Sequence, residues 1–430
     1  MAGMRTNGER TVSEGGAEFS RVTELGGREA TLLENGMLRV MIDDQGGMIP
    51  ELSAVRGRSR VNAHWLPWFR SNSGKPFGAA EEKFWKAGLL YDIAGNFPCA
   101  PSFGPGGNGG GVEIPVHGWT ANRLWRFVTG GTDGESGAAF AVSEMESPEG
   151  SMPLSFKKTD AVVPGESVHY ASLEITNRGK IDLEICCGWH NTLGAPFLQP
   201  GCRISGAAGR WSTPPKGGEF DETTRLVLDA EFASLAEAPL AGGGKADLSL
   251  VPGPTGYTDF ACGVIPASAH LGWSSLVNPA LGLAYVCFFP GKAAAAEDDI
   301  VLRFNDLWMQ YGGRNFTPWA PCEGGTDLAY CLGTENAAAA FAYGLEYSRE
   351  RGEVLGAPAV VIIPAGKSRT LRYGTLFAPY GEKILDGGIA AVEGGDGILA
   401  CGGKGGTARF GADGEFRVLK KIERRTGSAG

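Results

Sequence analysis

Glycine is spread along the whole of this chain and occupies 68 of its 430 residues, with 25 prolines beside it. Each glycine in a helix interior costs roughly 1 kcal/mol relative to alanine, so long helices disfavour such a composition. Short strands joined by tight turns accommodate it, because glycine reaches the backbone conformations that turns require. The glycine content therefore predicts a protein built mainly from strands and turns.

Hairpin patterns support the same prediction. Asn35-Gly36 separates two apolar runs over residues 31–42, which is the strongest short-range signal for a β-hairpin. Further strands are expected at residues 168–176, 181–187, 283–289, 359–363 and 370–377. Helical patterns are confined to residues 81–90 and 334–347, and no alternation of strands with helices indicates a parallel sheet. The expected fold is an all-β, large antiparallel β-sandwich with a few short helices.

Composition along the chain divides it into three parts. Residues 1–20 are polar and glycine-rich, which predicts a flexible N-terminal arm. Residues 21–384 carry the strand patterns and are expected to form the sandwich domain. Residues 385–430 are dense in glycine and predict a C-terminal extension packed on the same domain.

Charge and cysteine content exclude several classes of protein. The net charge of -9 argues against a nucleic-acid partner, which would need a basic surface. No run of about 18 apolar residues indicates a membrane span. Nine cysteines without a CxxC pair, behind a polar N-terminus, favour reduced thiols and a cytoplasmic location.

Sequence motifs for phosphates, metals and nucleophilic serine are weak. Gly104–Gly111 precedes a strand-like segment interrupted by a proline, whereas a dinucleotide loop opens a helix. Gly242-Gly243-Gly244-Lys245 lacks the Ser or Thr of a P-loop. The histidines have no spacing typical of metal ligands, and no GxSxG motif is present. The sequence therefore predicts no metal site and no bound cofactor.

Two of the five histidines are candidates for acid–base chemistry. His117 follows a strand-like segment, and His190 is expected to end an apolar strand where the chain turns out of the sheet. A histidine in such a place is held firmly and stays accessible, and its pKa near 6.5 suits proton transfer at neutral pH. For His169 and His270, we expect a surface position or a structural role.

Glu335 is the leading candidate for a catalytic carboxylate. It follows a strand-like run and precedes an alanine-rich one, where a carboxylate is costly to bury unless paired. The alternative is a residue at a helix N-terminus that accepts backbone hydrogen bonds. Glu323 and Asp306 are rival carboxylates. Trp119 and Trp308 lie near these groups in the sequence, and indole rings suit the apolar faces of sugars.

Taken in chain order, these motifs resemble the aldose 1-epimerase, or galactose mutarotase-like, family. The segments that carry the resemblance are residues 35–52, the proline-flanked loop 97–104, the His117-Gly118 step, residues 173–198 around His190, Leu332–Glu335 and the closing segment 362–377. The chain departs from the family pattern at Asn336, where many relatives have proline, and at Ala121, where some have arginine, with Arg123 two residues later.

The resemblance implies a galactose mutarotase-like supersandwich and an enzyme that interconverts the α and β anomers of a free sugar without a cofactor. It assigns the base to Glu335, the acid to His190 and an assisting role to His117. Asp306, Trp308, Arg123, Trp119 and Glu323 are the expected substrate-binding residues. Because no Lys/Arg cluster marks a phosphate site, neutral aldoses are favoured.

Two other hypotheses remain open at this level. The first is a carbohydrate-binding protein without catalytic activity. The second is another carbohydrate-active enzyme on the same fold, such as a lyase, a hydrolase or an epimerase acting at a different carbon. A hydrolase would need two carboxylates about 5–10 Å apart, which Glu335 could form with Glu323 or Asp306.

Overall fold

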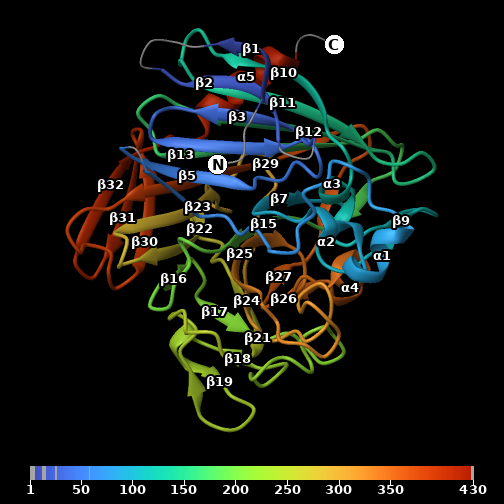
Figure 1. Cartoon of the computed structure of the whole chain (residues 1–430), viewed down its shortest axis with the longest axis vertical. Helices are drawn as coiled ribbons and strands as arrows, with labels where there is room; N and C mark the ends of the chain where they lie inside the picture. Colours follow the sequence, from blue (N-terminus) through green and yellow to red (C-terminus); the bar gives the residue numbers. More distant parts are fainter. Residues whose placement is uncertain (1–4, 12–15, 25–26, 58, 428–430) are drawn as a thin grey trace.

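The computed structural model describes residues 5–11, 16–24, 27–57 and 59–427. An antiparallel sheet of eight strands forms its centre (Figure 1). In spatial order these strands are β10 (Arg126–Thr132), β11 (Ala139–Glu146), β12 (Leu154–Val162), β13 (Val168–Asn177), β29 (Ser368–Pro379), β23 (Leu283–Pro290), β22 (Leu271–Asn278) and β16 (Arg203–Gly206).

Two further antiparallel sheets pack against this centre. The first contains β1 (Arg5–Thr11), β2 (Glu18–Thr23), β3 (Glu29–Glu34), β4 (Leu38–Asp43), β5 (Glu51–Arg56) and β6 (Ser59–Asn62), in sequence order. The second runs β18 (Glu231–Phe232), β17 (Arg210–Ser212), β21 (Tyr257–Val264), β24 (Phe304–Tyr311), β25 (Tyr330–Ala338), β15 (Cys187–Leu193) and β7 (Asn96–Cys99). One continuous apolar cluster is shared between them and the central sheet.

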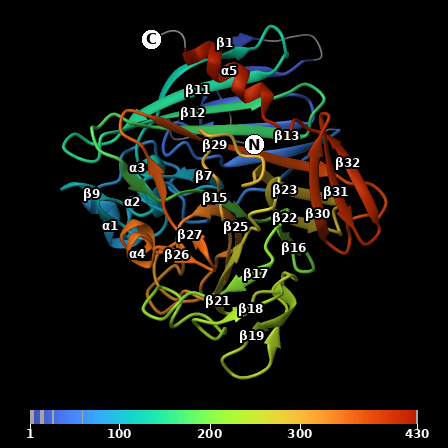
Figure 2. The same ribbon diagram turned by 180° about the vertical axis from the view of Figure 1, so that it is seen from behind.

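The C-terminal residues cover the other face of the central sheet. They form a three-stranded sheet of β30 (Ile389–Gly395), β31 (Ile398–Gly403) and β32 (Gly406–Gly411), followed by α5 (Arg417–Gly427). A second apolar cluster joins this segment to Tyr170 and Val286 of the central sheet through Leu399 and Ile422. Seen from either side, β30–β32 lie opposite the short helices α1–α4 (Figures 1 and 2).

The remaining elements are short. The helices are α1 (Ala79–Trp85), α2 (Gly88–Asp92), α3 (Gly118–Asn122), α4 (Gly344–Arg351) and the 3-10 turn η1 (Leu235–Glu237). Small strand pairs are β8 (Gly107–Asn108) with β9 (Glu113–Ile114), β14 (Leu183–Ile185) with β28 (Val361–Ile363), β19 (Ala238–Pro239) with β20 (Lys245–Ala246), and β26 (Glu353–Val354) with β27 (Ala357–Pro358). No helix among the described residues is both long and apolar enough to span a membrane.

The structure confirms the all-β prediction and the hairpin at Asn35-Gly36, which joins β3 to β4. The helix expected at residues 334–347 is wrong: β25 covers its first part, and α4 begins only at Gly344. Of the predicted N-terminal arm, residues 5–11 form β1, which pairs with β2, while residues 1–4 and 12–15 lie outside the described residues.

A buried polar network fixes which side chains of the seven-stranded sheet face the central sheet. Asn191 of β15 donates a hydrogen bond to Thr334 of β25 (2.8 Å) and accepts one from the hydroxyl of Tyr285 (2.6 Å). The hydroxyl of Tyr373 donates to Asn336. Because side chains alternate along a strand, His190 and Glu335 point to the opposite face, away from the central sheet.

Candidate active site

One row of side chains crosses the outer face of the seven-stranded sheet. Phe97 of β7 lies opposite His190, and Asp306 of β24 lies opposite Glu335 and next to Cys262 of β21. The pairs Trp189–Asn336 and Thr192–Gly333 place His190 opposite Glu335. Opposed residues of antiparallel strands share a face and approach closely, so strand register alone brings the row together.

His190 and Glu335 are in direct contact within this row. Nε2 of His190 lies 3.3 Å from Oε1 of Glu335, and Nδ1 lies 3.0 Å from the hydroxyl of Thr192. The imidazole stacks on Phe97, with ring centroids 4.5 Å apart. The sequence placed His190 at a strand end, and this is wrong. Asn191 and Thr192 continue strand β15 beyond it, so His190 lies mid-strand. Glu335 lies within a strand, so the alternative of a helix N-terminus is wrong.

His117 reaches the same site from a turn outside the sheet. It adopts a left-handed conformation (φ 60°) just before α3, and its ring packs edge-on against His190 with centroids 4.7 Å apart. The backbone N–H of Gly104 donates to Nδ1 of His117 (3.2 Å). Since Nδ1 accepts this bond, the ring proton lies on Nε2, and neutral His117 is a hydrogen-bond donor toward its surroundings.

Burial controls the protonation of all three groups. It lowers the pKa of His117 to about 3 and lowers the pKa of His190 well below its usual value, with repulsion between the two imidazoles adding to the effect on His190. It raises the pKa of Glu335 well above 4.5, and the nearby Asp306 and Glu219 carboxylates raise it further. The His190–Glu335 pair therefore favours its neutral form, in which the two groups together hold one proton.

The three groups open into one cavity of about 310 Å³, a size typical of the smaller ligand sites. Its walls are mainly apolar and aromatic, which suits the C–H faces of a small polar ring compound. The lining residues include Leu89, Leu90 and Ile93 from α2 and its end, Phe220 and Phe260, and Trp308, Phe316 and Trp319.

Arg314 lies in this cavity and was missed by the sequence analysis. Its guanidinium carbon lies 4.5 Å from the ring centroid of Trp319 and 5.4 Å from that of Trp308. One guanidinium nitrogen donates to Glu219 (2.8 Å), and the side chain is only 9% exposed. The segment GGRNFTPW, which follows a buried strand, was the available signal, since arginine between aromatic residues commonly stacks on them.

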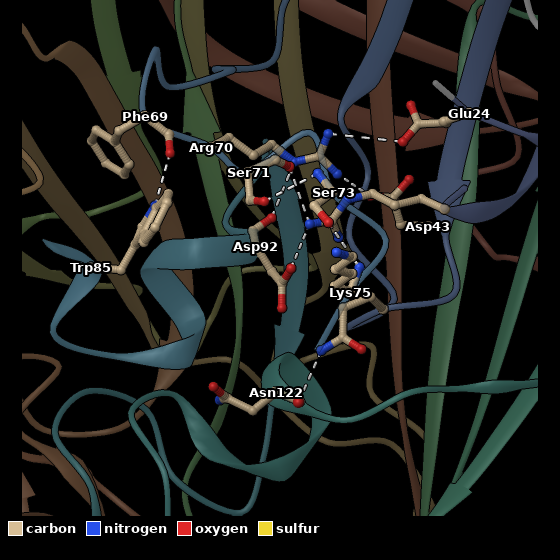
Figure 3. A network of polar contacts seen from close by, with 12 residues as sticks. Glu24, Asp43, Phe69, Arg70, Ser71, Ser73, Lys75, Trp85, Asp92 and Asn122 are labelled. Atoms are coloured by element: carbon tan, nitrogen blue, oxygen red, sulfur yellow. Dashed lines mark hydrogen bonds and ion pairs between the residues drawn. The ribbon is translucent and has the colours of Figure 1, made fainter. Parts of the chain in front are cut away.

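A network of polar contacts holds α1 and α2, and α2 forms part of the cavity wall (Figure 3). Arg70 binds Asp43 of β4, and its Nε donates to the backbone oxygen of Asp92 at the end of α2 (3.2 Å). Arg28 donates to the carboxylate of Asp92 (2.6 Å). The indole of Trp85 donates to the backbone oxygen of Phe69 (2.9 Å). Buried charge pairs thus connect the six-stranded sheet to the wall of the cavity.

The predicted binding residues occupy different places. Trp308 lines the cavity. Asp306 is fully buried beside Glu335 and Cys262 and is not among the lining residues. Trp119 is buried and donates to the backbone oxygen of Glu113 (3.1 Å). Arg123 lines a separate surface cleft with Arg126 and Glu144.

Glu323 and Glu335, which the sequence offered as alternative catalytic carboxylates, lie in different places. Glu323 is 61% exposed and binds Lys86 (2.9 Å) and the hydroxyl of Thr317 (2.7 Å), away from the two histidines. Of the two, only Glu335 contacts His190 and lines the cavity. No cluster of three or more His, Cys, Asp or Glu side chains suited to a metal ion occurs in the residues that the structure describes.

Comparisons with known proteins identify the fold. No protein-family profile matches the chain, and no curated protein matches it in sequence. Among solved structures, a "putative aldose 1-epimerase" from Klebsiella pneumoniae is similar over 87% of this chain and 91% of its own, with 14% identity and a TM-score of 0.62. A galactose mutarotase-like protein from Clostridium acetobutylicum covers 88% of this chain with 99% of its own, at 10% identity and a TM-score of 0.53.

A "putative aldose 1-epimerase" from Escherichia coli K12 shows the same likeness, with 15% identity, 87% and 99% coverage and a TM-score of 0.50. At such low identity the likeness concerns the fold. The chain thus has the β-sandwich architecture of galactose mutarotase-like proteins. This result agrees with the fold that the sequence motifs imply.

Proposed function

We propose that the protein is an aldose 1-epimerase, which interconverts the α and β anomers of a sugar. The observation that carries the proposal is the His190–Glu335 contact of 3.3 Å, beside His117 on the wall of a small apolar cavity. Anomer exchange requires only that one group take a proton while another gives one, and this pair supplies both functions. The fold of the solved relatives adds support.

The reaction needs a base at the anomeric hydroxyl and an acid at the ring oxygen. Removal of the proton from the anomeric hydroxyl and protonation of the ring oxygen break the bond between C1 and the ring oxygen and give an open-chain aldehyde. Rotation about C1–C2 presents the other carbonyl face, and closure returns both protons. In the proposed assignment Glu335 takes the proton of the anomeric hydroxyl and His190 protonates the ring oxygen. These roles require the one proton of the pair to lie on His190 when the sugar is bound, and sugar hydroxyls that donate to Glu335 would favour this transfer by stabilising its carboxylate form.

His117 is proposed to stabilise charge that develops on the sugar oxygens. With its proton on Nε2 and its pKa at about 3, it stays a neutral donor across the physiological range. Burial strengthens such a donor, because water does not compete for the sugar oxygen. His117 therefore contributes a fixed hydrogen bond, while the proton transfers belong to the pair.

Nuclear magnetic resonance exchange between α and β anomers tests the proposal directly. The measurement covers a panel of aldoses, after subtraction of the spontaneous rate. We expect Glu335→Gln to abolish enzyme-dependent exchange while the folded state remains, because glutamine keeps the shape and loses the proton-transfer group. Glu323→Gln serves as the comparison, since that carboxylate is exposed and outside the cavity.

Each alternative function predicts a different result. A carbohydrate-binding protein would show saturable binding with no acceleration in the wild type. A hydrolase that uses Asp306 with Glu335 would need both carboxyl groups to face the sugar, and Asp306 does not line the cavity. Exchange by Glu335→Gln at the wild-type rate would refute the assignment of Glu335.

A further inference from the structure

The cavity contains one permanently cationic side chain among its described lining residues, that of Arg314. Burying a guanidinium is costly unless an anion compensates it. The carboxylate that its guanidinium contacts is that of Glu219, whose own side chain is 56% exposed and which comes from a distant loop, while the buried Asp327 carboxylate accepts the backbone N–H of Arg314. A buried cation facing a ligand cavity thus has a partner that is itself largely in solvent.

We infer that the substrate is an aldose with a carboxylate substituent, a uronic acid, and that Arg314 binds this carboxylate in the place now held by Glu219. The inference rests on the proposed function and specifies its substrate class. Arg314 is a binding residue in this assignment and takes no part in the proton transfers. The step is an exchange of one carboxylate for another at the guanidinium.

Geometry places Arg314 at a suitable distance from the catalytic pair. The indole of Trp308 lies between them, with its ring centroid 5.9 Å from that of His190 and 5.4 Å from the guanidinium carbon of Arg314. A pyranose ring lying along this indole would reach the catalytic pair with C1 and the ring oxygen, and Arg314 with the carboxylate carried by C5, on the other side of the ring oxygen. Aromatic rings commonly take the apolar face of a sugar in this manner.

The single positive charge favours a carboxylate over a phosphate ester. The planar fork of a guanidinium matches the two oxygens of a carboxylate in a bidentate pair. A phosphate ester carries a charge of about -1.5 to -2 at neutral pH and would leave part of that charge uncompensated in an apolar cavity. The group that Arg314 binds in the structure is itself a carboxylate.

Arg314 is held in place independently of Glu219. Its side chain stacks on Trp319, and its backbone N–H donates to the carboxylate of Asp327 (2.8 Å). Glu219 follows Gly217 and Gly218 in an irregular segment, and a largely exposed carboxylate contributes little to an ion pair. A substrate carboxylate enclosed by the cavity would interact more strongly and displace it.

The experiment compares sugars that differ only at C6. Anomer exchange is measured for galactose and galacturonate, for glucose and glucuronate, and for glucose 6-phosphate as the second anion. For the wild type we expect kcat/KM to be at least about tenfold higher for each uronate than for its neutral partner, because only the uronate gives the buried cation an enclosed carboxylate in place of the exposed Glu219. Glucose 6-phosphate should fall below glucuronate.

Three variants assign this preference to Arg314. In Arg314→Gln the uronate-to-neutral ratio should fall toward one. In Glu219→Gln, which removes the competing carboxylate and keeps Arg314, KM for uronates should fall several-fold relative to KM for their neutral partners. Arg21→Gln is the matched control, since Arg21 also stacks on an aromatic ring (Phe127, 4.7 Å) and binds a carboxylate (Asp44), but lies far from the cavity in β2. Its ratio should equal that of the wild type.

The outcomes separate the two proposals. Enzyme-dependent exchange of neutral sugars with no preference for uronates would overturn the substrate class and leave the proposed function standing. A uronate preference that survives in Arg314→Gln, or a preference for the phosphate ester, would also overturn the inference. Absence of exchange for every sugar would refute the proposed function, and the inference would fail with it.

Discussion

Asp306 and Glu335 lie directly opposite each other on β24 and β25 and share the outer face of the sheet. Both carboxyl groups are buried, and directly opposed side chains have Cβ atoms about 5 Å apart. Burial raises the pKa of Asp306 to about 7, and burial together with the charge of Asp306 raises the pKa of Glu335 well above 4.5. The two carboxyl groups therefore resist being ionised together at neutral pH.

Asp306→Asn should stabilise the protein at alkaline pH. The pKa of Asp306 is higher in the folded state than its unfolded value near 3.8, so ionisation opposes folding, beginning above pH 3.8 and reaching its full effect above about 7. A shift of this size corresponds to at most about 4 kcal/mol in the free energy of unfolding. Urea denaturation should show the variant to be more stable than the wild type near pH 8 and similar to it near pH 4.

Asp259→Asn is the control for this measurement. Asp259 is also buried in the neighbouring strand β21, but its carboxylate accepts bonds from Thr224 (2.8 Å) and Arg225 (2.7 Å). Loss of that carboxylate should destabilise the protein near pH 8, in contrast to Asp306→Asn. Equal effects of the two substitutions would contradict the account of Asp306.

The pH dependence of anomer exchange should report the His190–Glu335 pair. The active form holds one proton between the two groups, so kcat/KM should fall when a second proton binds or when the first is lost. Because the pKa of His190 is lowered and that of Glu335 is raised, the acid limb should lie well below 6.5 and the alkaline limb well above 4.5.

Asp306→Asn supplies a second check on this profile. Removing the Asp306 charge lowers the pKa of Glu335, so the alkaline limb should move to lower pH while the acid limb stays in place. Exchange rates measured from about pH 4 to pH 9, corrected for the spontaneous reaction, give both limbs. A single transition at the ordinary pKa of a free carboxyl or imidazole would argue against the coupled pair.

The sequence predicted the parts of this site that depend on local pattern. The strand and turn signals around residues 173–198 made His190 a candidate, although they placed it at a strand end, and the His117-Gly118 step made His117 a candidate. Local pattern failed for the secondary structure around Glu335. The alanines that follow it favour a helix, but the first of them lie in strand β25. Both faces of β25 are buried, so packing between sheets outweighed local propensity. Arg314 and Glu219 meet across 95 residues, a contact that depends on the folded chain.

Gly104→Ala should reduce exchange by displacing His117. A Cβ atom at Gly104 would lie 1.8 Å from the backbone oxygen of Ala342, and its φ of +113° disfavours other residues. The loop would have to move, yet its N–H and C=O both bind His117 (3.2 and 2.8 Å). A displacement of about 1 Å can cost on the order of 100-fold in rate, which the exchange assay would detect.

Gly111→Ala is the matched control for that substitution. Gly111 lies in the same glycine-rich segment and also has a positive φ (+101°), but no heavy atom lies within 4 Å of a Cβ placed there. We expect only a modest loss of stability and an exchange rate near that of the wild type. If both variants lost exchange equally, backbone strain in the segment would explain the effect, and contact with His117 would not.

Arg70→Leu should destabilise the whole cavity wall. Arg70 binds Asp43, whose side chain is 1% exposed and whose pKa burial raises to about 7, so the variant leaves an uncompensated carboxylate in the core (Figure 3). Breaking one partner of a buried pair costs about 3–5 kcal/mol, whereas replacing both partners is far less costly. Urea denaturation near pH 8 should show this loss for Arg70→Leu and substantial recovery for the double variant with Asp43→Asn.

Arg178→Leu is the control for this measurement. It breaks an exposed pair with Glu146 and should cost under about 1 kcal/mol. Since Arg70 also anchors the end of α2, which carries Leu89 and Leu90 into the cavity, the double variant should recover stability while keeping a raised KM for the sugar.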